Sequence, residues 1–91
     1  MAHSVSLSWT ASVDAVSGYN VYRSAAAGLK TTLLTTTPVT VTTYIDSTVL
    51  PGSWYYDVTS VENGAESVVS NSVNAVILPA PPTNLVLVSA S

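Results

Sequence analysis

The sequence contains no cysteine. A disulfide framework is therefore excluded as a source of stability, and cysteine usage does not indicate a redox compartment. A chain of 91 residues must then depend on one hydrophobic core, which is modest at this size. We expect a single domain in which every core strand matters.

Charge is also scarce, and basic charge most of all. Two basic residues, Arg23 and Lys30, stand against five acidic ones, and the net charge is -3. No basic stripe could neutralise phosphates, so nucleic acid is not expected as a partner. The same shortage weakens any attraction to anionic membranes, and no apolar run is long enough to predict membrane insertion. Residues 1–3 do not start a basic and then apolar segment, so no signal peptide is expected in this chain.

The residue types that catalysis needs do not form a constellation. His3 is the single histidine and lies near a chain end, and the serines lack a nucleophile-elbow glycine pattern. A calcium site would need several carboxylates in one short loop, which the sequence does not offer. We predict no enzyme, and no catalytic, cofactor-binding or metal-binding residue. The acidic residues are expected in loops and at outward positions: Asp14, Asp46, Asp57, Glu62 and Glu66. Among them, Asp46 and Glu66 are expected to hydrogen-bond turns.

The sequence is rich in valine, threonine and serine, and apolar and polar residues alternate with a period of two. This pattern predicts strands over residues 3–9, 19–23, 29–37, 39–45, 54–61, 71–77 and 82–88. Asn63-Gly64 signals a two-residue hairpin and Pro51-Gly52 a type II turn. Seven short strands without a helical period indicate an all-β, two-sheet antiparallel sandwich. The side chains expected to face inward are Val5, Leu7, Trp9, Tyr19, Val21, Leu33 or Leu34, Tyr44, Trp54, Tyr56, Val58, Val73, Ala75 and Ile77.

These segments, in this order, resemble a fibronectin type III domain of the divergent bacterial sort. The resemblance is carried by Val5-x-Leu7-x-Trp9, the run from Gly18 to Arg23, Tyr44-x-Asp46, Pro51-Gly52-Ser53 and the run from Ser70 to Val73. It implies an immunoglobulin-like sandwich and an extracellular or cell-surface location, but no particular role, because this fold hosts many.

The chain departs from the family pattern in two ways. The family places a tyrosine after the Pro-Gly turn, whose hydroxyl bonds back to the backbone. Either Trp54 or Tyr55 can hold that position here, and we favour Trp54, because the alternative facing buries Asp57 without a partner. The second departure is that the first strand of the family pattern lies at the C-terminus, in residues 83–91, behind a stiff Pro-rich linker at residues 79–82.

The displaced strand predicts self-association. In the family's sandwich the first strand starts at one pole and the last strand ends at the other, about 25 Å away for eight residues. The linker spans only about 14 Å, so the tail is not expected to fill its own slot in the native direction. We predict head-to-tail strand donation, with acceptor residues Val5, Leu7 and Trp9 and donor residues Leu85, Val86, Leu87 and Val88. Contacts of this type need not close, so filaments are expected.

Two alternatives to the filament stay open at this stage. The chain can form a closed swapped dimer, or it can be a monomeric spacer or binding module cut from a secreted multidomain protein. In the second case outward Tyr22 and Tyr55 are the candidates for contact with a glycan or protein. Tyrosines on a sheet face more often form cross-strand pairs, which is the interpretation we favour.

Overall fold

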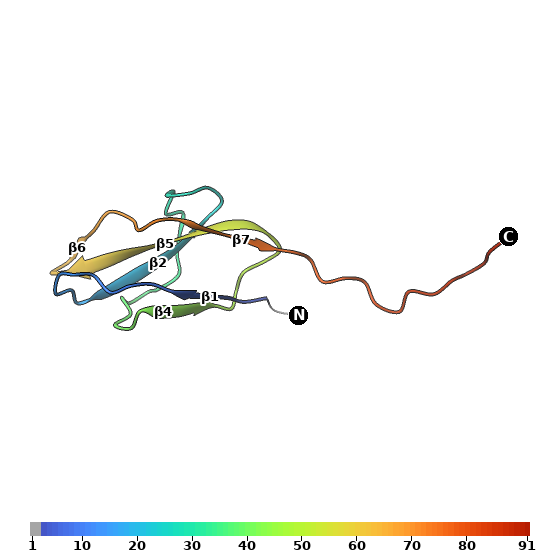
Figure 1. The fold of residues 1–91 in the computed structure, drawn as a ribbon, viewed down its shortest axis with the longest axis horizontal. Coiled ribbons are helices and arrows are strands. Elements are labelled where there is room, and N and C mark those ends of the chain that lie inside the picture. Colours follow the sequence, from blue (N-terminus) through green and yellow to red (C-terminus); the bar gives the residue numbers. More distant parts are fainter. Residues whose placement is uncertain (1–2) are drawn as a thin grey trace.

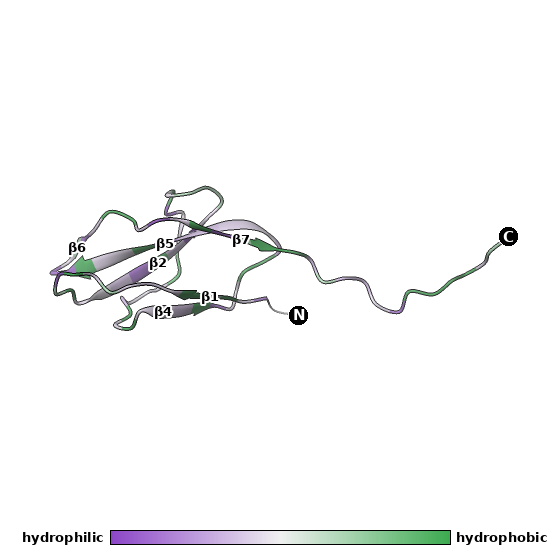
Figure 2. Ribbon diagram, viewed as in Figure 1, coloured by the Kyte–Doolittle hydropathy of each residue, from purple (hydrophilic) through white to green (hydrophobic). Residues whose placement is uncertain are grey.

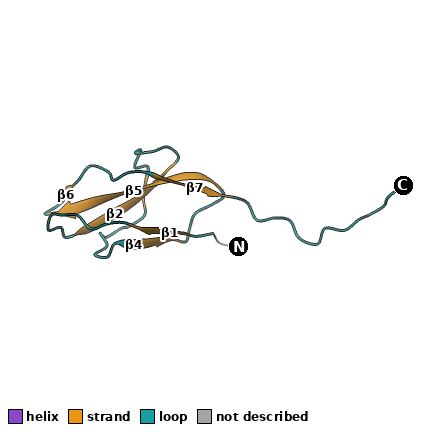
Figure 3. Cartoon of the chain, viewed as in Figure 1, coloured by secondary structure: helices purple, strands orange, loops and turns teal. Residues whose placement is uncertain are grey.

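The computed structural model describes residues 3–91. These residues contain no helix and form two antiparallel sheets (Figures 1 and 3). The smaller sheet pairs β1 (Val5–Ser8) with β4 (Thr43–Asp46). The larger sheet contains β2 (Gly18–Ser24), β3 (Thr32–Leu33), β5 (Gly52–Glu62), β6 (Ala65–Glu66) and β7 (Val73–Ile77). The predicted all-β architecture of two antiparallel sheets is confirmed.

The long strand β5 organises the larger sheet. One of its edges pairs with β2 from Gly18↔Val61 to Ser24↔Tyr55. Its other edge pairs with β6 at one end and with β7 at the other. The hairpin between β5 and β6 turns at Asn63 and Gly64, whose φ angles of 52° and 78° are those that the Asn-Gly pair predicts.

The core lies between the two sheets and is small. Trp9, just after β1, meets Tyr19 of β2 edge to face, with ring centroids 5.6 Å apart. The predicted inward facing of Tyr19, Val21 and Tyr56 is confirmed, since all three are buried. The buried apolar and aromatic side chains among the described residues are Tyr19, Val21, Val49 and Tyr56.

Two predicted strands are shorter than expected. Within residues 29–37 only β3 forms, because the hydroxyl of buried Thr35 accepts the Val21 N–H and replaces a backbone carbonyl in the ladder. Within residues 39–45 the strand β4 starts only at Thr43. Val39 instead bridges to Tyr19 in the other sheet, so the residues between Val39 and Thr43 must cross from one sheet to the other.

Close approach at this crossing requires glycine at position 18. A Cβ there would lie 2.7 Å from the Cβ of Pro38 and 2.9 Å from the carbonyl oxygen of Val39. Gly18, the first residue of β2, is therefore the point at which the crossing segment packs onto the strand.

Asp57 corrects a sequence expectation. It alternates with Tyr56 and so points to the outer face of the larger sheet, as expected, yet its exposed fraction is only 1%. The hydroxyl of Ser72 donates to one carboxylate oxygen, and the other oxygen is buried without a partner among the described residues. Burial follows because β5 is flanked on both edges, which the alternation of β5 alone does not reveal.

Residues 78–91 form no strand and run away from the sheets (Figures 1 and 2). This tail gives the chain a longest dimension of 70 Å against about 20 Å in the other two. It leaves from the pole at which β7 ends and β1 begins (Figure 1). The strand expected over residues 82–88 is absent, and Asn84 has a φ of 59°, which interrupts any extended run through it.

Candidate functional site

The outer edge of β1 is unpaired, because β4 is its single partner in the smaller sheet. The Trp9 N–H donates to the Thr42 carbonyl at 3.0 Å, which continues the ladder of Leu7 with Tyr44 and Val5 with Asp46. Backbone groups in an antiparallel pair alternate between the two edges of a strand. The N–H and C=O groups of Ser6 and Ser8 therefore point to the open edge.

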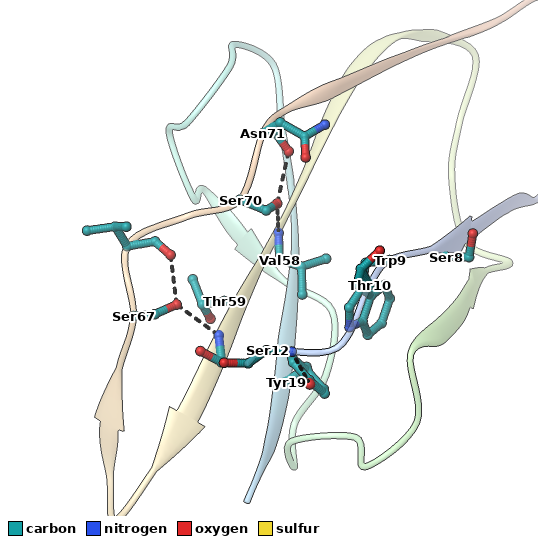
Figure 4. A pocket seen from close by; sticks show the side chains of 12 residues that line it. Ser8, Trp9, Thr10, Ser12, Tyr19, Val58, Thr59, Ser67, Ser70 and Asn71 are labelled. Carbon is teal, nitrogen blue, oxygen red and sulfur yellow. Dashed lines mark hydrogen bonds between the residues drawn. The ribbon is translucent and has the colours of Figure 1, made fainter. Parts of the chain in front are cut away.

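A groove of about 470 Å³ lies along this open edge, between the end of β1 and the larger sheet (Figure 4). It continues into a smaller hollow of about 70 Å³ deeper along β1. The groove is lined by Ser8, Trp9, Thr10, Ser12, Tyr19, Val58, Thr59, Ser60, Ser67, Val68, Ser70 and Asn71. The hollow is lined by Leu7, Ser8, Trp9, Tyr56, Val58, Ser70, Asn71 and Val73.

Two serines form the far wall of the groove. The Ser67 hydroxyl accepts the Ser60 N–H, and the Ser70 hydroxyl accepts the Val58 N–H, each at 3.0 Å (Figure 4). Each hydroxyl also donates to the carbonyl of the residue that follows it. These side chains bond to β5 in place of a continuous strand. The strand pairing along this edge of β5 is therefore interrupted between β6 and β7, and β7 starts at Val73 instead of residue 71.

Apolar surface is exposed along the groove. Val73 faces the hollow and is 43% exposed, although its strand position was expected to be inward. Val68 on the rim is 88% exposed. The indole N–H of Trp9 is buried and donates to no acceptor among the described residues, an unusual state for a buried donor.

The structure brings together part of the predicted acceptor set. Leu7 and Trp9 line the hollow, whereas Val5 is half-buried on β1 and is absent from both linings. The sequence pattern does not indicate that Ser67, Ser70 and Val73 form the opposite wall. The Ser-x-x-Ser spacing was the available signal, but serine is too common in this chain for that spacing to stand out.

The predicted donor residues lie outside the groove in this single chain. Leu85, Val86, Leu87 and Val88 are 96%, 70%, 82% and 91% exposed. No hydrogen bond of residues 3–91 involves residues 78–91. The tail starts at the pole where β1 begins, while the wider part of the groove lies near Ser12, beyond the other end of β1 (Figure 1).

Tyr22 and Tyr55 lie on the outer face of the larger sheet and are half-buried. The Tyr22 hydroxyl donates to Glu66, and the Lys30 ammonium lies 5.3 Å from the Tyr22 ring centroid. Burial raises the pKa of the Tyr22 hydroxyl, and the Glu66 carboxylate raises it further. Tyr22 is thus engaged within the sheet, which agrees with the cross-strand interpretation.

Glu66 is the centre of this outer cluster and does not hydrogen-bond a turn, contrary to expectation. Its carboxylate accepts from Thr59 at 2.6 Å, from Tyr22, from Asn20 at 3.2 Å and from Lys30 at 3.2 Å. The hydrogen bond from Thr59, followed by that from Tyr22, lowers the pKa of Glu66 to about 2. The carboxylate is therefore ionised at neutral pH and fixes β6 to β2 and β5.

Asp46 does bond its turn, as expected, and also links the two sheets. It accepts from the Thr48 N–H at 3.0 Å, from Arg23 at 2.7 Å and from the Tyr56 hydroxyl at 2.7 Å. Burial raises the pKa of Asp46, but the hydrogen bonds from Tyr56, Thr48 and Arg23 outweigh it and hold that pKa below its usual value. Arg23 also lies 5.3 Å from the Trp54 ring centroid.

The corner position after the Pro-Gly turn belongs to Trp54. Its indole N–H donates to the Leu50 carbonyl at 2.8 Å, four residues upstream, and its ring packs on Gly52, which has a φ of 144°. Trp54 shares the face of Tyr56, as favoured from the sequence. The indole N–H thus makes the backbone bond that a tyrosine hydroxyl would make.

Chemistry-bearing residues form no further site in the described part of the chain. Residues 3–91 hold no group of three or more histidine, aspartate or glutamate residues that could bind a metal ion. They also contain no helix with the length and hydropathy of a membrane span. Comparisons of the chain with protein-family models, with curated proteins and with solved structures find no match. The groove and the tail are thus the features from which a function can be inferred.

Proposed function

We propose that this protein is a non-enzymatic structural module that assembles head-to-tail, with the tail of one molecule filling the groove beside β1 of the next. The observation that carries the proposal is the match between an unpaired strand edge and an unpaired apolar tail in one chain. Unpaired edges are templates for strand addition, and a further chain segment can occupy them.

The order of the strands supports residues 83–91 as the segment that occupies the open edge of β1. An immunoglobulin-like sandwich places its first strand beside its second, at the edge of one sheet. If β1 is the second strand of a fibronectin type III-like domain, the empty edge of β1 is the slot of the first strand. The segment that resembles this strand is at residues 83–91.

The position of the tail favours its insertion into the groove of a second molecule over insertion into the groove of its own chain. An antiparallel strand beside β1 must enter near Ser12 and run toward the start of β1, where the tail begins (Figure 1). Returning to the entry would require about 25 Å, whereas four linker residues span about 14 Å. A second molecule placed in line needs no return, and the contact then repeats without closing.

The energetics are adequate for assembly. Burial of two leucine side chains contributes about 3–6 kcal/mol, and main-chain pairing with β1 adds to this. Association and ordering of the tail oppose it, but the prolines at 79, 81 and 82 restrict the free tail and lower that cost. Tyr22 supports the alternative of a glycan-binding monomer less well, because its hydroxyl already donates to Glu66.

Light scattering after size-exclusion chromatography, over a concentration series, tests this proposal. The full chain should form species that grow with concentration and look long and thin in negative stain. A chain ending at residue 78 should remain a monomer, since it keeps every strand but has no donor. Undiminished polymer in the truncated chain, or a concentration-independent monomer of the full chain, would overturn the proposal.

A further inference from the structure

The groove also limits how a donor strand can be seated. Resting on the proposed assembly, we infer that the donor runs antiparallel to β1 in one register, with Leu85 opposite Trp9 and Leu87 opposite Leu7. Val86 and Val88 then lie opposite Ser8 and Ser6 on the outer surface. The partner is thus a second copy of this chain, and the groove binds it through two leucines, Leu85 and Leu87.

The facing of the donor follows from the pairing of β1 with β4. Trp9, Leu7 and Val5 direct their backbone groups toward β4 and their side chains toward the larger sheet. A strand on the open edge bonds to Ser6 and Ser8, and residues directly opposite each other project to the same face. The donor residues opposite Trp9 and Leu7 must therefore point into the groove.

The two hollows select the register. The wide part of the groove lies against Trp9, and the smaller hollow lies against Leu7, Tyr56 and Val73. Neighbouring same-face residues of a strand are about 6.6 Å apart, so one leucine can fill each hollow. Moving the donor two residues toward Val5 places one leucine outside both hollows, and moving it two residues toward Ser12 leaves the hollow at Leu7 without a leucine.

Asn84 supplies an independent argument for the same register. Its φ of 59° is incompatible with a paired strand position. With Leu85 opposite Trp9, Asn84 lies opposite Thr10, beyond the last residue of β1, and can keep this conformation. The alternative with Leu85 opposite Leu7 would place Asn84 opposite Ser8, inside β1, where it would have to become extended.

A donor strand can enter the groove without displacing the segment that carries Ser67 and Ser70. Both hydroxyls already satisfy β5, at Ser60 and Val58, so the inserted strand need not compete for these backbone groups. Val68 is exposed on the rim and can cover Leu85 once it is seated.

Cysteine pairing tests this register, because the natural chain has no cysteine to interfere. The double variant S8C/V86C should give a ladder of covalent dimers, trimers and longer species on a non-reducing gel after mild oxidation. In the inferred register these two positions form a hydrogen-bonded pair with Cα atoms about 5.5 Å apart, within disulfide range. The variant S6C/V86C is the matched control, since its Cα atoms would be about 7–8 Å apart. Its ladder should be weaker on the order of tenfold.

The outcomes separate the register from the assembly itself. A stronger ladder from S6C/V86C than from S8C/V86C would overturn the register while leaving strand donation intact. A disulfide formed within a monomer would show insertion of a chain's own tail and would overturn both. Polymer without a ladder from either variant would overturn the groove as the site. As a second measurement, L85N/L87N should lose assembly while V86N/V88N retains it, and all four positions lie in the exposed tail, so the sheets should fold in both.

Discussion

The two flanks of this sandwich are closed to different degrees. On the flank where β4 meets β2 and β3, side chains cross between the sheets: Arg23 and Tyr56 bond Asp46, and the Tyr44 hydroxyl donates to the Leu34 carbonyl at 3.2 Å. On the flank where β1 faces β7, the space is an open groove. The same two sheets are thus joined by side chains on one flank and leave a groove on the other.

The comparison explains the small core. Leu7, Trp9 and Val73 project inward but keep some exposure, because nothing lies across the groove from them. Side chains on the closed flank are sealed by partners from both sheets. A donor strand in the groove would bury the exposed apolar surface of these three side chains. Assembly should therefore raise the free energy of unfolding.

The largest expected effect comes from breaking the closed flank. Replacement Asp46→Ala removes the shared acceptor and leaves the Arg23 guanidinium and the Tyr56 hydroxyl without it. Breaking a buried pair in this way costs about 3–5 kcal/mol, and the low end applies because the Arg23 side chain is 17% exposed. Urea unfolding of the chain ending at residue 78 measures this loss without a contribution from assembly.

Asp46→Asn is the control for that variant. It keeps an acceptor of the same shape and should lose less stability than Asp46→Ala. Equal losses would mean that the carboxylate charge, and not its position as an acceptor, closes the flank.

A smaller effect is expected at the corner where β5 begins. Replacement Trp54→Phe removes the N–H that donates to the Leu50 carbonyl while keeping an aromatic ring beside Arg23. We expect a loss of about 1 kcal/mol in the free energy of unfolding. Tyr55→Phe should change it by less than about 0.5 kcal/mol. The reverse order of the two losses would assign the corner to Tyr55.

The smallest effect is expected from the outer face, where Glu66 joins strands of one sheet and closes neither flank. Its pKa of about 2 lies below the ordinary value of 4.5, so the unfolded chain binds this proton more readily. The stabilisation from Glu66 is therefore complete above about pH 4.5 and is lost as the pH falls toward 2. In Glu66→Gln, the midpoint of thermal unfolding should depend less on pH between about 2 and 4.5 than in the unchanged chain.

An unchanged pH dependence in Glu66→Gln would assign the acid sensitivity to Asp46. That carboxylate also has a lowered pKa, held down chiefly by the Tyr56 hydrogen bond against the effect of burial. Its contribution has the same sign and is likewise lost toward low pH.

Much of the fold could be predicted from local pattern. Alternation in residues 5–9 and 54–61 located β1 and β5, and Asn63-Gly64 located the hairpin, because side-chain period and turn conformation are local properties. The lengths of β3 and β4 could not be predicted, because Thr35 and Val39 bond β2 across a distance in sequence. The burial of Asp57 was missed for the same reason, since it depends on the segments that flank both edges of β5.

The sequence by itself determined the strand composition, the inward row on β1 and the apolar alternation of the tail, since each depends on residue identity and spacing. It also determined that no disulfide supports the fold. The displaced strand also predicted an open edge beside β1. Only the tertiary structure decided that Ser67 and Ser70 form the wall opposite that edge and that Asp46 seals the other flank. These features depend on which backbone groups remain unpaired after the sheets form, and that is a property of the whole arrangement of strands.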